Sequence, residues 1–486
     1  MDISRSKGGD VRETNVRSEV AVIGGGASGT LVASHLLRRA RGGRIALIER
    51  RAEIGCGVAY STRSPEHLLN VPAGNMSALP EDLSHFVRWL RGGHMPEANE
   101  KTFAPRFLFA RYLQKVLEEA ERASGAELVR LRGEATGVDV GSGWVRVRLG
   151  DRREVRARRA VLALGNFPPR RLPFAPHDPR HVPDAWEDGA LDGIPDEAPI
   201  LLVGTSLTAI DVAMSLRARG HTGRIYAVSR RGLVPNPYAD RVSSPPYPPF
   251  LSPADSHDLT GLIRKVRSEV RRATGLGTDW HPVIEAIRPL AQRLWESMPV
   301  NERRRFLRHL QPYWEVHRHR VAPQVGEVVR RMRRSGEFVV IAGRIRRLRK
   351  VPGGVEIEIT LRGGGKWVLR AFCTVNCTAP EMDLRRVGHP LIAGLLRDGR
   401  ARPGPLGIGL ETDGEGALVE ADGSVSRILY TLGPLRKGDL WETIAIPEIR
   451  EQAARLAAEL LRTERGVTSG LRDVPYADLL ESGGGS

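Results

Sequence analysis

The sequence predicts an α/β protein with two parallel-sheet units and a helical insertion. Two glycine-rich segments support this class, because each joins a short apolar strand to a helical pattern, first near residue 24 and again near residue 204. A third observation is that strand patterns return at 338–375, after a helical stretch from about 255 to 330. A strand, a glycine turn and a helix in this order are typical of a Rossmann-like, dinucleotide-binding domain. We therefore predict two such domains in one chain.

The first unit has the spacing of a dinucleotide-binding turn. Gly24 permits the tight turn, Gly26 lets the backbone approach a pyrophosphate, and Gly29 permits close contact between helix and strand. The next strand, 44–49, ends in an acid whose carboxylate is suited to ribose hydroxyls. An acid there disfavours a 2′-phosphate, so FAD or NAD fits better than NADP. The residues predicted to bind FAD are Gly24, Gly26, Ala27, Ser28, Gly29, Glu49 and Arg50.

The second unit departs from this pattern at two positions. Ser206 and Ala209 replace the second and third glycines, and both are small enough to keep the close approach. The following strand, 224–229, ends in no acid and leads into two arginines, which suit a 2′-phosphate. NADPH is therefore favoured and NADH remains possible, while the alternative for the arginines is a solvated pair. The residues predicted to bind this coenzyme are Gly204, Ser206, Leu207, Arg230 and Arg231.

Composition limits the class of protein. The 486 residues suffice for two or three packed domains, and no apolar run approaches the length of a membrane span. The first 17 residues are polar and lack a signal-peptide core, and three cysteines argue against a disulfide framework. We expect a cytoplasmic protein with core thiols at Cys373 and Cys377. The net charge is +17, but arginines are spread along the chain without an aromatic stacking platform, so we expect neither a nucleic-acid nor a membrane partner.

Breaks in the pattern divide the chain. Gly165, which precedes a proline pair, and a similar turn at 376–380 are the points where the chain is expected to pass between domains. The Gly/Ser run at 482–486 is typical of a flexible tail. The predicted segments are 18–170 and 381–465 for the two parts of the FAD-binding domain, 195–235 and 331–380 for the two parts of the NAD(P)-binding domain, and 236–330 for a Pro-rich segment with the helical insertion.

Several segments together resemble one known family. They are Gly57–Tyr60, His67–Pro72, Phe86–Leu90, Pro105–Arg106 with Tyr112, Gly204–Asp211, Ser229–Pro235, His317–Arg320, and Trp441–Thr443 with Pro447–Arg450. In these the chain is similar to bacterial FAD/NAD(P)-binding monooxygenase-like proteins, which include FAD-dependent urate hydroxylase and aspartate N-monooxygenase. It is more distantly similar to flavin N-hydroxylases and Baeyer–Villiger enzymes. The resemblance implies an FAD-dependent, NAD(P)H-driven monooxygenase that acts on a small molecule and O₂ through a flavin C4a-hydroperoxide.

Two other functions stay open. One is a flavin-dependent NAD(P)H reductase or oxidase that inserts no oxygen, and the other is a flavoprotein in which FAD is structural or redox-sensing. The same two sites would serve all three, and nothing in the sequence selects a substrate or an oligomeric state.

The flavin carries the chemistry in this class, so few dedicated catalytic side chains are expected. The loop after the second strand is expected to run beside the flavin ring, where Asn70, Asn75 and Ser77 are candidates for hydrogen bonds to its edges. Hydrogen bonds within the loop are the alternative. Arg106 is a candidate for a phosphate or an anionic substrate, with a structural role as the alternative. The further cofactor-binding candidates are Tyr60, Gly165, Gly433 and Trp441.

Two features near the C-terminal half complete the prediction. A helix that starts near Trp441 is expected to aim its positive end at the flavin pyrimidine. His317 and His319 have no evident third ligand, so no metal is expected. Their alternate spacing predicts that one faces a cleft and the other faces solvent.

Overall fold

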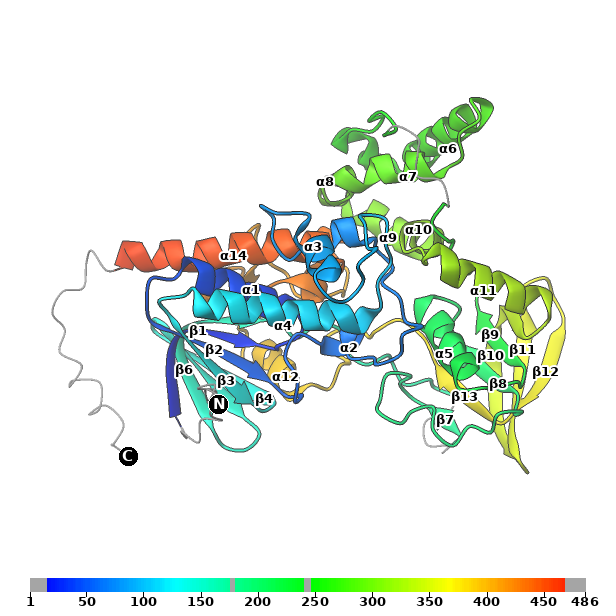
Figure 1. The fold of residues 1–486 in the computed structure, drawn as a ribbon, viewed down its shortest axis with the longest axis horizontal. Helices are drawn as coiled ribbons and strands as arrows, with labels where there is room; N and C mark the ends of the chain where they lie inside the picture. The colour runs from blue at the N-terminus through cyan, green and yellow to red at the C-terminus, as the bar shows by residue number, and fades with distance from the viewer. Residues whose placement is uncertain (1–14, 175–179, 240–245, 468–486) are drawn as a thin grey trace.

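The computed structural model describes residues 15–174, 180–239 and 246–467. This part of the chain forms two sheets side by side, and a group of helices stands above them (Figure 1). The predicted α/β class with two strand–turn–helix units is confirmed. Most of the polar N-terminal segment and the Gly/Ser tail at 482–486 lie outside the described residues.

The first sheet contains the Gly24 turn. Its strand order is β14-β15-β6-β1-β2-β3, and β5 joins β6 and β4. The pairs β1–β2, β2–β3, β1–β6 and β15–β6 are parallel, so the last strand of the described chain returns to the sheet that the first strand began. The strands are β1 (Asn15–Ile23), β2 (Arg44–Glu49), β3 (Glu127–Arg132), β4 (Ala135–Gly141), β5 (Trp144–Leu149), β6 (Glu154–Leu162), β14 (Ala417–Val419) and β15 (Val425–Thr431).

Both faces of the first sheet are covered, which explains the unbroken apolar run at the end of β1. Val20 and Val22 enter one core, while Ala21 and Ile23 enter the other, because successive strand residues point to opposite faces. The first core is closed by α1, α4 and α14, which lie together over the sheet (Figure 1). Their bounds, with that of α12 on the second core, are α1 (Ala27–Arg39), α4 (Arg106–Arg122), α14 (Ile446–Val467) and α12 (Pro390–Arg397).

The second sheet contains the Gly204 turn. Its order is β12-β11-β10-β9-β8-β13-β7, parallel from β10 to β7 and antiparallel from β10 to β12. Cys373 and Cys377 are buried free thiols at β13, as predicted, and burial raises the pKa of Cys373 to about 12. The elements are β7 (His181–Val182), β8 (Ile200–Val203), β9 (Ile225–Ser229), β10 (Phe338–Val351), β11 (Gly354–Leu361), β12 (Lys366–Ala371), β13 (Cys373–Asn376), α5 (Leu207–Ala218) and α11 (Pro323–Arg334).

A helical insertion lies between β9 and β10 in the chain and stands above both sheets (Figure 1). Its helices are α6 (Leu259–Gly275), α7 (His281–Ile287), α8 (Ala291–Ser297), α9 (Val300–His309) and α10 (Gln311–Arg318). The remaining short helices are α2 (Gly57–Tyr60), α3 (His85–Arg91) and α13 (Lys437–Leu440), with 3₁₀ turns at Ala73–Asn75, Pro253–His257, Arg288–Leu290 and Gly433–Arg436.

Trp441 anchors the insertion to the C-terminal part of the chain. Its ring stacks on Trp295 with centroids 4.8 Å apart and meets Phe306 edge-on at 5.3 Å. The side chain is buried in one cluster with Leu259 and Met298, so it serves the insertion core. Trp441 also ends α13 with a φ of +59°, and the long helix α14 begins five residues later, which corrects the predicted continuous helix from this point.

Replacing Trp441 with alanine is expected to cost about 3–5 kcal/mol of unfolding free energy, because the cavity would open in the contact that docks the insertion. Denaturant unfolding would measure this loss of free energy, and limited proteolysis would measure the undocking of the insertion. Leu276→Ala is the control, since that side chain is 76% exposed in the insertion. Equal unfolding midpoints for the two variants would contradict the docking role.

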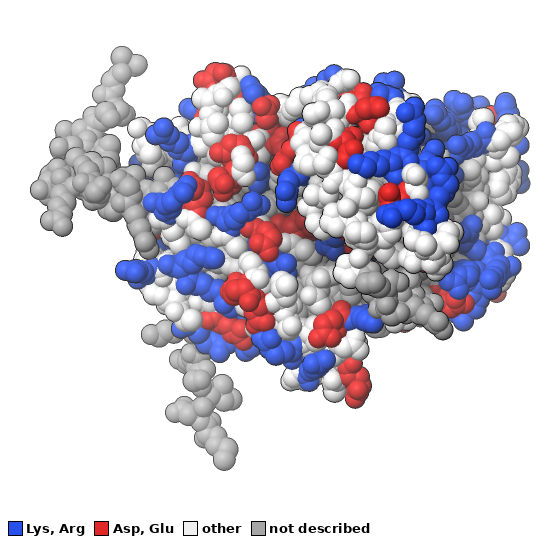
Figure 2. All heavy atoms as spheres, turned by 90° about the horizontal axis from the view of Figure 1, so that it is seen from above, with Lys and Arg blue, Asp and Glu red and all other residues white. Residues whose placement is uncertain are grey.

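The positive charge is concentrated in one part of the molecule. Residues 261–380 hold 25 Lys and Arg against 10 Asp and Glu, which is +15 of the net +17. Figure 2 shows blue side chains gathered over the second unit, whereas red and blue mix over the first. Arginines do occur along the whole chain, as predicted, but the net positive charge is concentrated in this segment, because acidic residues elsewhere nearly equal the basic ones in number.

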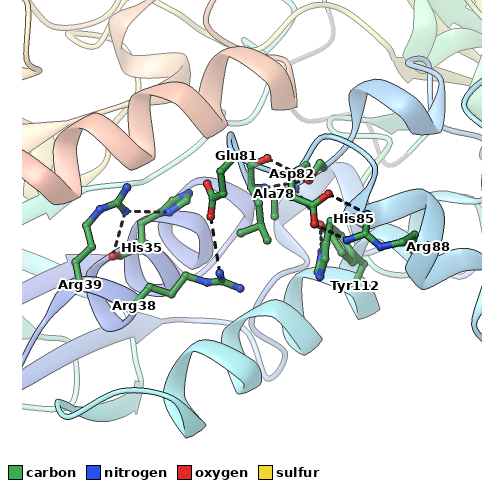
Figure 3. A network of polar contacts seen from close by, with 11 residues as sticks. His35, Arg38, Arg39, Ala78, Glu81, Asp82, His85, Arg88 and Tyr112 are labelled. Carbon is green, nitrogen blue, oxygen red and sulfur yellow. Dashed lines mark hydrogen bonds and ion pairs between the residues drawn. The ribbon is translucent and has the colours of Figure 1, made fainter.

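A polar network joins α1 to α3 and α4 on the first core (Figure 3). His35 is 1% exposed, and its Nδ1 lies 3.2 Å from Nη1 of Arg39. The hydroxyl of Tyr112 accepts the backbone N–H of Ala78 at 3.0 Å and lies 2.8 Å from Nδ1 of His85. These contacts fix the loop that carries residues 78–85 against the helices.

Burial of His35 predicts that the protein loses stability at acidic pH. Burial, and then the charge of Arg39, lowers the pKa of His35 from 6.5 to about 4. Because the pKa of His35 is lower in the folded than in the unfolded protein, acid favours the unfolded state. The free energy of unfolding is therefore highest above pH 6.5 and falls by on the order of 3 kcal/mol as the pH drops towards 4. His35→Gln should flatten unfolding free energy measured between pH 6.5 and 4, whereas the exposed His94→Gln should not. An unchanged slope in His35→Gln would remove His35 as the cause.

Candidate functional site

One large cavity lies where the two units face each other. Its volume is about 1840 Å³, and its walls come from 50–63 after β2, 204–208 after β8, 343–345 on β10, and 444–446 at the start of α14. Ligands of open α/β sheets bind outside the carboxyl ends of the strands, and this cavity occupies that position for the second sheet. It is therefore the candidate active site.

The first turn has the geometry that a dinucleotide requires. Gly24 has a φ of +104°, and a Cβ there would lie 2.3 Å from the carbonyl oxygen of Ala163. A Cβ on Gly29 would lie 1.8 Å from the oxygen of Gly24, so helix and strand are in close contact as predicted. No side chain caps α1 and no acid lies in its first turn, which leaves its N-terminal N–H groups available to an anion.

The turn residues lie behind the cavity wall. Gly57 covers Gly26, since a Cβ on Gly26 would be 3.3 Å from the Cα of Gly57. The predicted residues of this first unit that do not themselves line the cavity are Gly24, Gly26, Ala27, Ser28, Gly29 and Glu49, whereas Arg50 lines it, as does Tyr60 in the following loop.

Glu49 is held against the turn. Its Oε2 accepts the N–H of Gly25 at 2.6 Å, and its Oε1 accepts the N–H of Arg51 at 2.9 Å. An ionised carboxylate has about four acceptor positions, so about two remain for the predicted ribose hydroxyls.

The second turn repeats the geometry of the first. Gly204 has a φ of +126°, and a Cβ would lie 2.3 Å from the carbonyl oxygen of Cys377. The N–H of Gly204 donates to Val228, just as that of Gly24 donates to Ile48. Helix α5 begins at Leu207 without a side-chain cap or an acid in its first turn. Gly204, Ser206 and Leu207 all line the cavity, so its wall at this end is the predicted turn.

Arg230 and Arg231 also line the cavity, just beyond β9. Arg231 lies over the ring of Tyr313 with its Cζ 5.5 Å from the centroid. Its Nη2 donates long hydrogen bonds of 3.5 Å to the carbonyls of Arg308 and His309 on the insertion. The pair is thus placed between the second unit and the insertion.

Arg106 and Asp211 join the two units across the cavity. Arg106 donates from Nη1 and Nη2 to the two oxygens of Asp211 at 2.8 and 3.2 Å, and from Nε to the oxygen of Leu68 at 3.0 Å. Both side chains are about nine-tenths buried, with 12% and 11% exposed. Nε2 of His67 lies 3.0 Å from the backbone carbonyl oxygen of Asp211 and 2.7 Å from Oγ of Ser215. The guanidinium predicted to meet a phosphate is in this structure bound to a carboxylate.

The loop candidates separate into two groups. Asn70 and Tyr60 line the cavity, and burial raises the pKa of Tyr60. Ser77 is fully buried, and its hydroxyl donates to the carbonyl of Asp82 at 2.6 Å, which matches the alternative of bonding within the loop. Asn75 is exposed in the 3₁₀ turn and does not line the cavity.

The C-terminal candidates also separate. Gly433 touches the first turn, since a Cβ there would lie 3.0 Å from Oγ of Ser28, and its φ is +69°. Gly165 has a φ of +68° and is followed by four residues, 166–169, that line the cavity. Trp441 is buried in the insertion cluster and does not line the cavity, which instead receives residues 444–446.

The insertion supplies one wall that the sequence did not reveal. Glu315, His319 and Lys437 line the cavity together, with Oε2 of Glu315 3.3 Å from Nε2 of His319 and Oε1 3.8 Å from Nζ of Lys437. His319 is therefore the cleft-facing histidine of the predicted pair, whereas His317 does not line the cavity and is half-buried edge-on to Trp280 instead of facing open solvent. A helical pattern with Glu315 and His319 four residues apart was the available signal.

The described residues hold neither a cluster of metal ligands nor a helix suited to a membrane. They contain no group of three or more His, Cys, Asp or Glu side chains placed to hold a metal ion. Within the same part of the chain, no helix is both long and apolar enough to cross a membrane.

A family model matches the segment that contains the first turn. Residues 21–167 match a family model described as FAD-NAD(P)-binding. An uncharacterized protein of Mycobacterium tuberculosis is 23% identical over 483 residues, which covers 86% of this chain and 89% of the relative.

Solved structures share the fold over 92% of this chain. The ornithine N-hydroxylase of Kutzneria sp. 744 has a TM-score of 0.60 at 14% identity and is covered to 100%. The L-lysine 6-monooxygenase of Pseudomonas syringae has a TM-score of 0.62 at 15% identity and is covered to 99%. The bacillithiol disulfide reductase of Staphylococcus aureus has a TM-score of 0.52 at 11% identity, also covered to 99%. The predicted resemblance is thus confirmed for the FAD-NAD(P)-binding segment and for the fold.

Proposed function

We propose that this protein is a cytoplasmic, FAD-dependent, NADPH-driven monooxygenase that acts on a small molecule. The observation that carries the proposal is the single cavity bordered by both units. Two dinucleotides bound at the two turns would extend into the same space, which is what electron transfer from one to the other requires. The free thiols of Cys56, Cys373 and Cys377 are compatible with a reducing compartment.

The residues present fit both groups. The uncapped start of α1 and the glycine turn suit the pyrophosphate of FAD, and Glu49 retains acceptors for the ribose. The uncapped start of α5, with Arg230 and Arg231, suits the phosphates of NADPH. When bound, the flavin takes two electrons from NADPH and reduces O₂, so that one oxygen atom enters the substrate and the other leaves as water.

The chain itself would hold the reacting groups together. The Arg106–Asp211 pair fixes the second unit against the first. The start of α14 presents its positive end at 444–446, and the charge of Glu448 in its first turn is met by Arg288 at 3.4 Å and Arg318 at 3.6 Å. Glu315, His319 and Lys437 supply ionisable groups on the wall where a substrate would lie.

The test begins with the purified protein and its flavin spectrum. NADPH is then added without O₂, and the bleaching of the flavin is timed. We expect a yellow protein that NADPH reduces. A colourless protein that also fails to bind added FAD would overturn the proposal.

A reductase or oxidase is the second candidate, favoured by the shared fold with a bacillithiol disulfide reductase. The discriminating measurement is the fate of O₂ during turnover with a screen of small-molecule substrates. Oxygenated product equal to NADPH consumed supports the monooxygenase. Hydrogen peroxide, or reduction of an added disulfide, with every substrate supports the second candidate.

A further inference from the structure

Unpaired arginines converge at the edge of the second sheet, next to the cavity. Ser229 pairs with Ala342 in the parallel register of β9 and β10, and Arg231 and Arg344 each follow that pair by two residues in the chain. Gly232 packs against Ala342, where a Cβ would meet the Ala342 Cβ at 3.0 Å, and this keeps the two strand ends together. Arg344 lines the cavity with Arg230 and Arg231, although it lies more than 110 residues away in the chain.

The insertion closes this edge with Tyr313. The tyrosine lies beneath Arg231, and hydrogen bonding to Arg362, and then to Arg231, lowers its pKa. Arg362 is fixed nearby, because its backbone N–H donates to the oxygen of Ala342 at 2.8 Å. One phenol and several guanidinium groups thus face one small region from β9, β10, the β11–β12 turn and α10.

These cations have no acidic partner in the structure as far as it is described. Arg230, Arg231, Arg344 and Arg362 form none of the ion pairs found among residues 15–174, 180–239 and 246–462. The surrounding segment also carries +15 of the net charge. Like charges held close together are unfavourable unless an anion joins them, so the cluster has the character of an anion site.

We propose that Arg344 and Tyr313 complete, with Arg230 and Arg231, a subsite for a phosphate monoester, the 2′-phosphate of NADPH. This rests on the proposed function and adds two residues to it. Arg344 is a coenzyme-specificity residue that the sequence places far from the turn. Tyr313 gives the helical insertion a part in choosing the coenzyme, because its hydroxyl oxygen accepts hydrogen bonds from Arg362 and Arg231 and its ring lies under Arg231.

The test measures binding rather than turnover. Calorimetry on the FAD-loaded protein would compare adenosine 2′,5′-bisphosphate with 5′-AMP, which differ only in the 2′-phosphate. The wild type is expected to bind the bisphosphate at least tenfold more tightly. Arg344→Gln should lose about tenfold or more of the affinity for the bisphosphate and none for 5′-AMP. Tyr313→Phe should lose a smaller part in the same selective way.

Arg347→Gln is the matched control, because Arg347 is exposed on the same strand but does not line the cavity. Equal bisphosphate affinity in Arg344→Gln and Arg347→Gln would overturn the inference, as would equal affinities of the wild type for the two nucleotides. Either result leaves the proposed function standing if the flavin is present and NADPH reduces it. Absence of flavin binding would instead remove the proposed function itself.

Discussion

Replacing Asp211 with alanine is expected to lower the unfolding free energy by about 3–5 kcal/mol, because it leaves the Arg106 guanidinium buried without its counter-ion. The pair joins α4, on the first sheet, to α5, on the second, by two hydrogen bonds. Its loss should therefore also loosen the position of one unit relative to the other. We also expect that NADPH reduces FAD more slowly in this variant, although the flavin is still bound.

The measurements are denaturant unfolding and anaerobic reduction kinetics. Asp192→Ala is the control. Asp192 forms an ion pair with Arg219 at the C-terminal end of α5, but its side chain is 72% exposed. An exposed pair of that kind contributes about 0–1 kcal/mol. A similar loss in both variants would show that burial is not what makes Asp211 important.

A double variant separates stability from positioning. Arg106→Met with Asp211→Leu removes both charges, so no buried ion is left alone, and much of the stability should return. The directional contact between the units would remain absent, so reduction should stay slow. Recovery of the reduction rate together with stability would mean that the pair is structural and does not position the two coenzymes.

The sequence predicted the two turns because each is a local signal. Gly24 and Gly204 are recognised by the strand and helix patterns that flank them, and these patterns lie within about 15 residues of each glycine. The acid after β2 and the arginines after β9 are likewise at fixed spacing from their glycines. Such features need no knowledge of distant contacts, which is why the fold class followed from them.

The rest of the site depends on contacts between distant residues. Asp211 and Arg106 are 105 positions apart, and each alone reads as an ordinary charged residue on a helix. Glu315 and Lys437 come together only because Trp441 docks the insertion. Because Trp441 packs in this contact, it does not line the cavity. Ser77 lies in the interior because its hydroxyl is hydrogen-bonded within its own loop. Packing, rather than residue type, decided these positions.

The two glycine turns should fail independently when they are altered. A Cβ on Gly24 would lie 2.3 Å from the oxygen of Ala163, and one on Gly204 would lie 2.3 Å from that of Cys377. Neither contact can form, so the strand ends must move and each turn must lose its shape. Gly24→Ala should therefore yield protein without flavin. Gly204→Ala should keep the flavin, yet NADPH should no longer reduce it at low coenzyme concentration.

Gly220→Ala is the control that isolates the steric clash from backbone strain. Gly220 has a φ of +88°, in the same positive range, but a Cβ there would meet nothing within 4 Å. It should cost only the strain of that conformation, about 1–2 kcal/mol, and leave both coenzymes bound. Flavin content per protein, affinity for NADPH and circular dichroism would be measured for all three variants. Loss of both coenzymes in each turn variant, with folded protein, would contradict two separate sites. The separation is expected because each glycine contacts only its own sheet, so the damage should stay with the dinucleotide that this sheet holds.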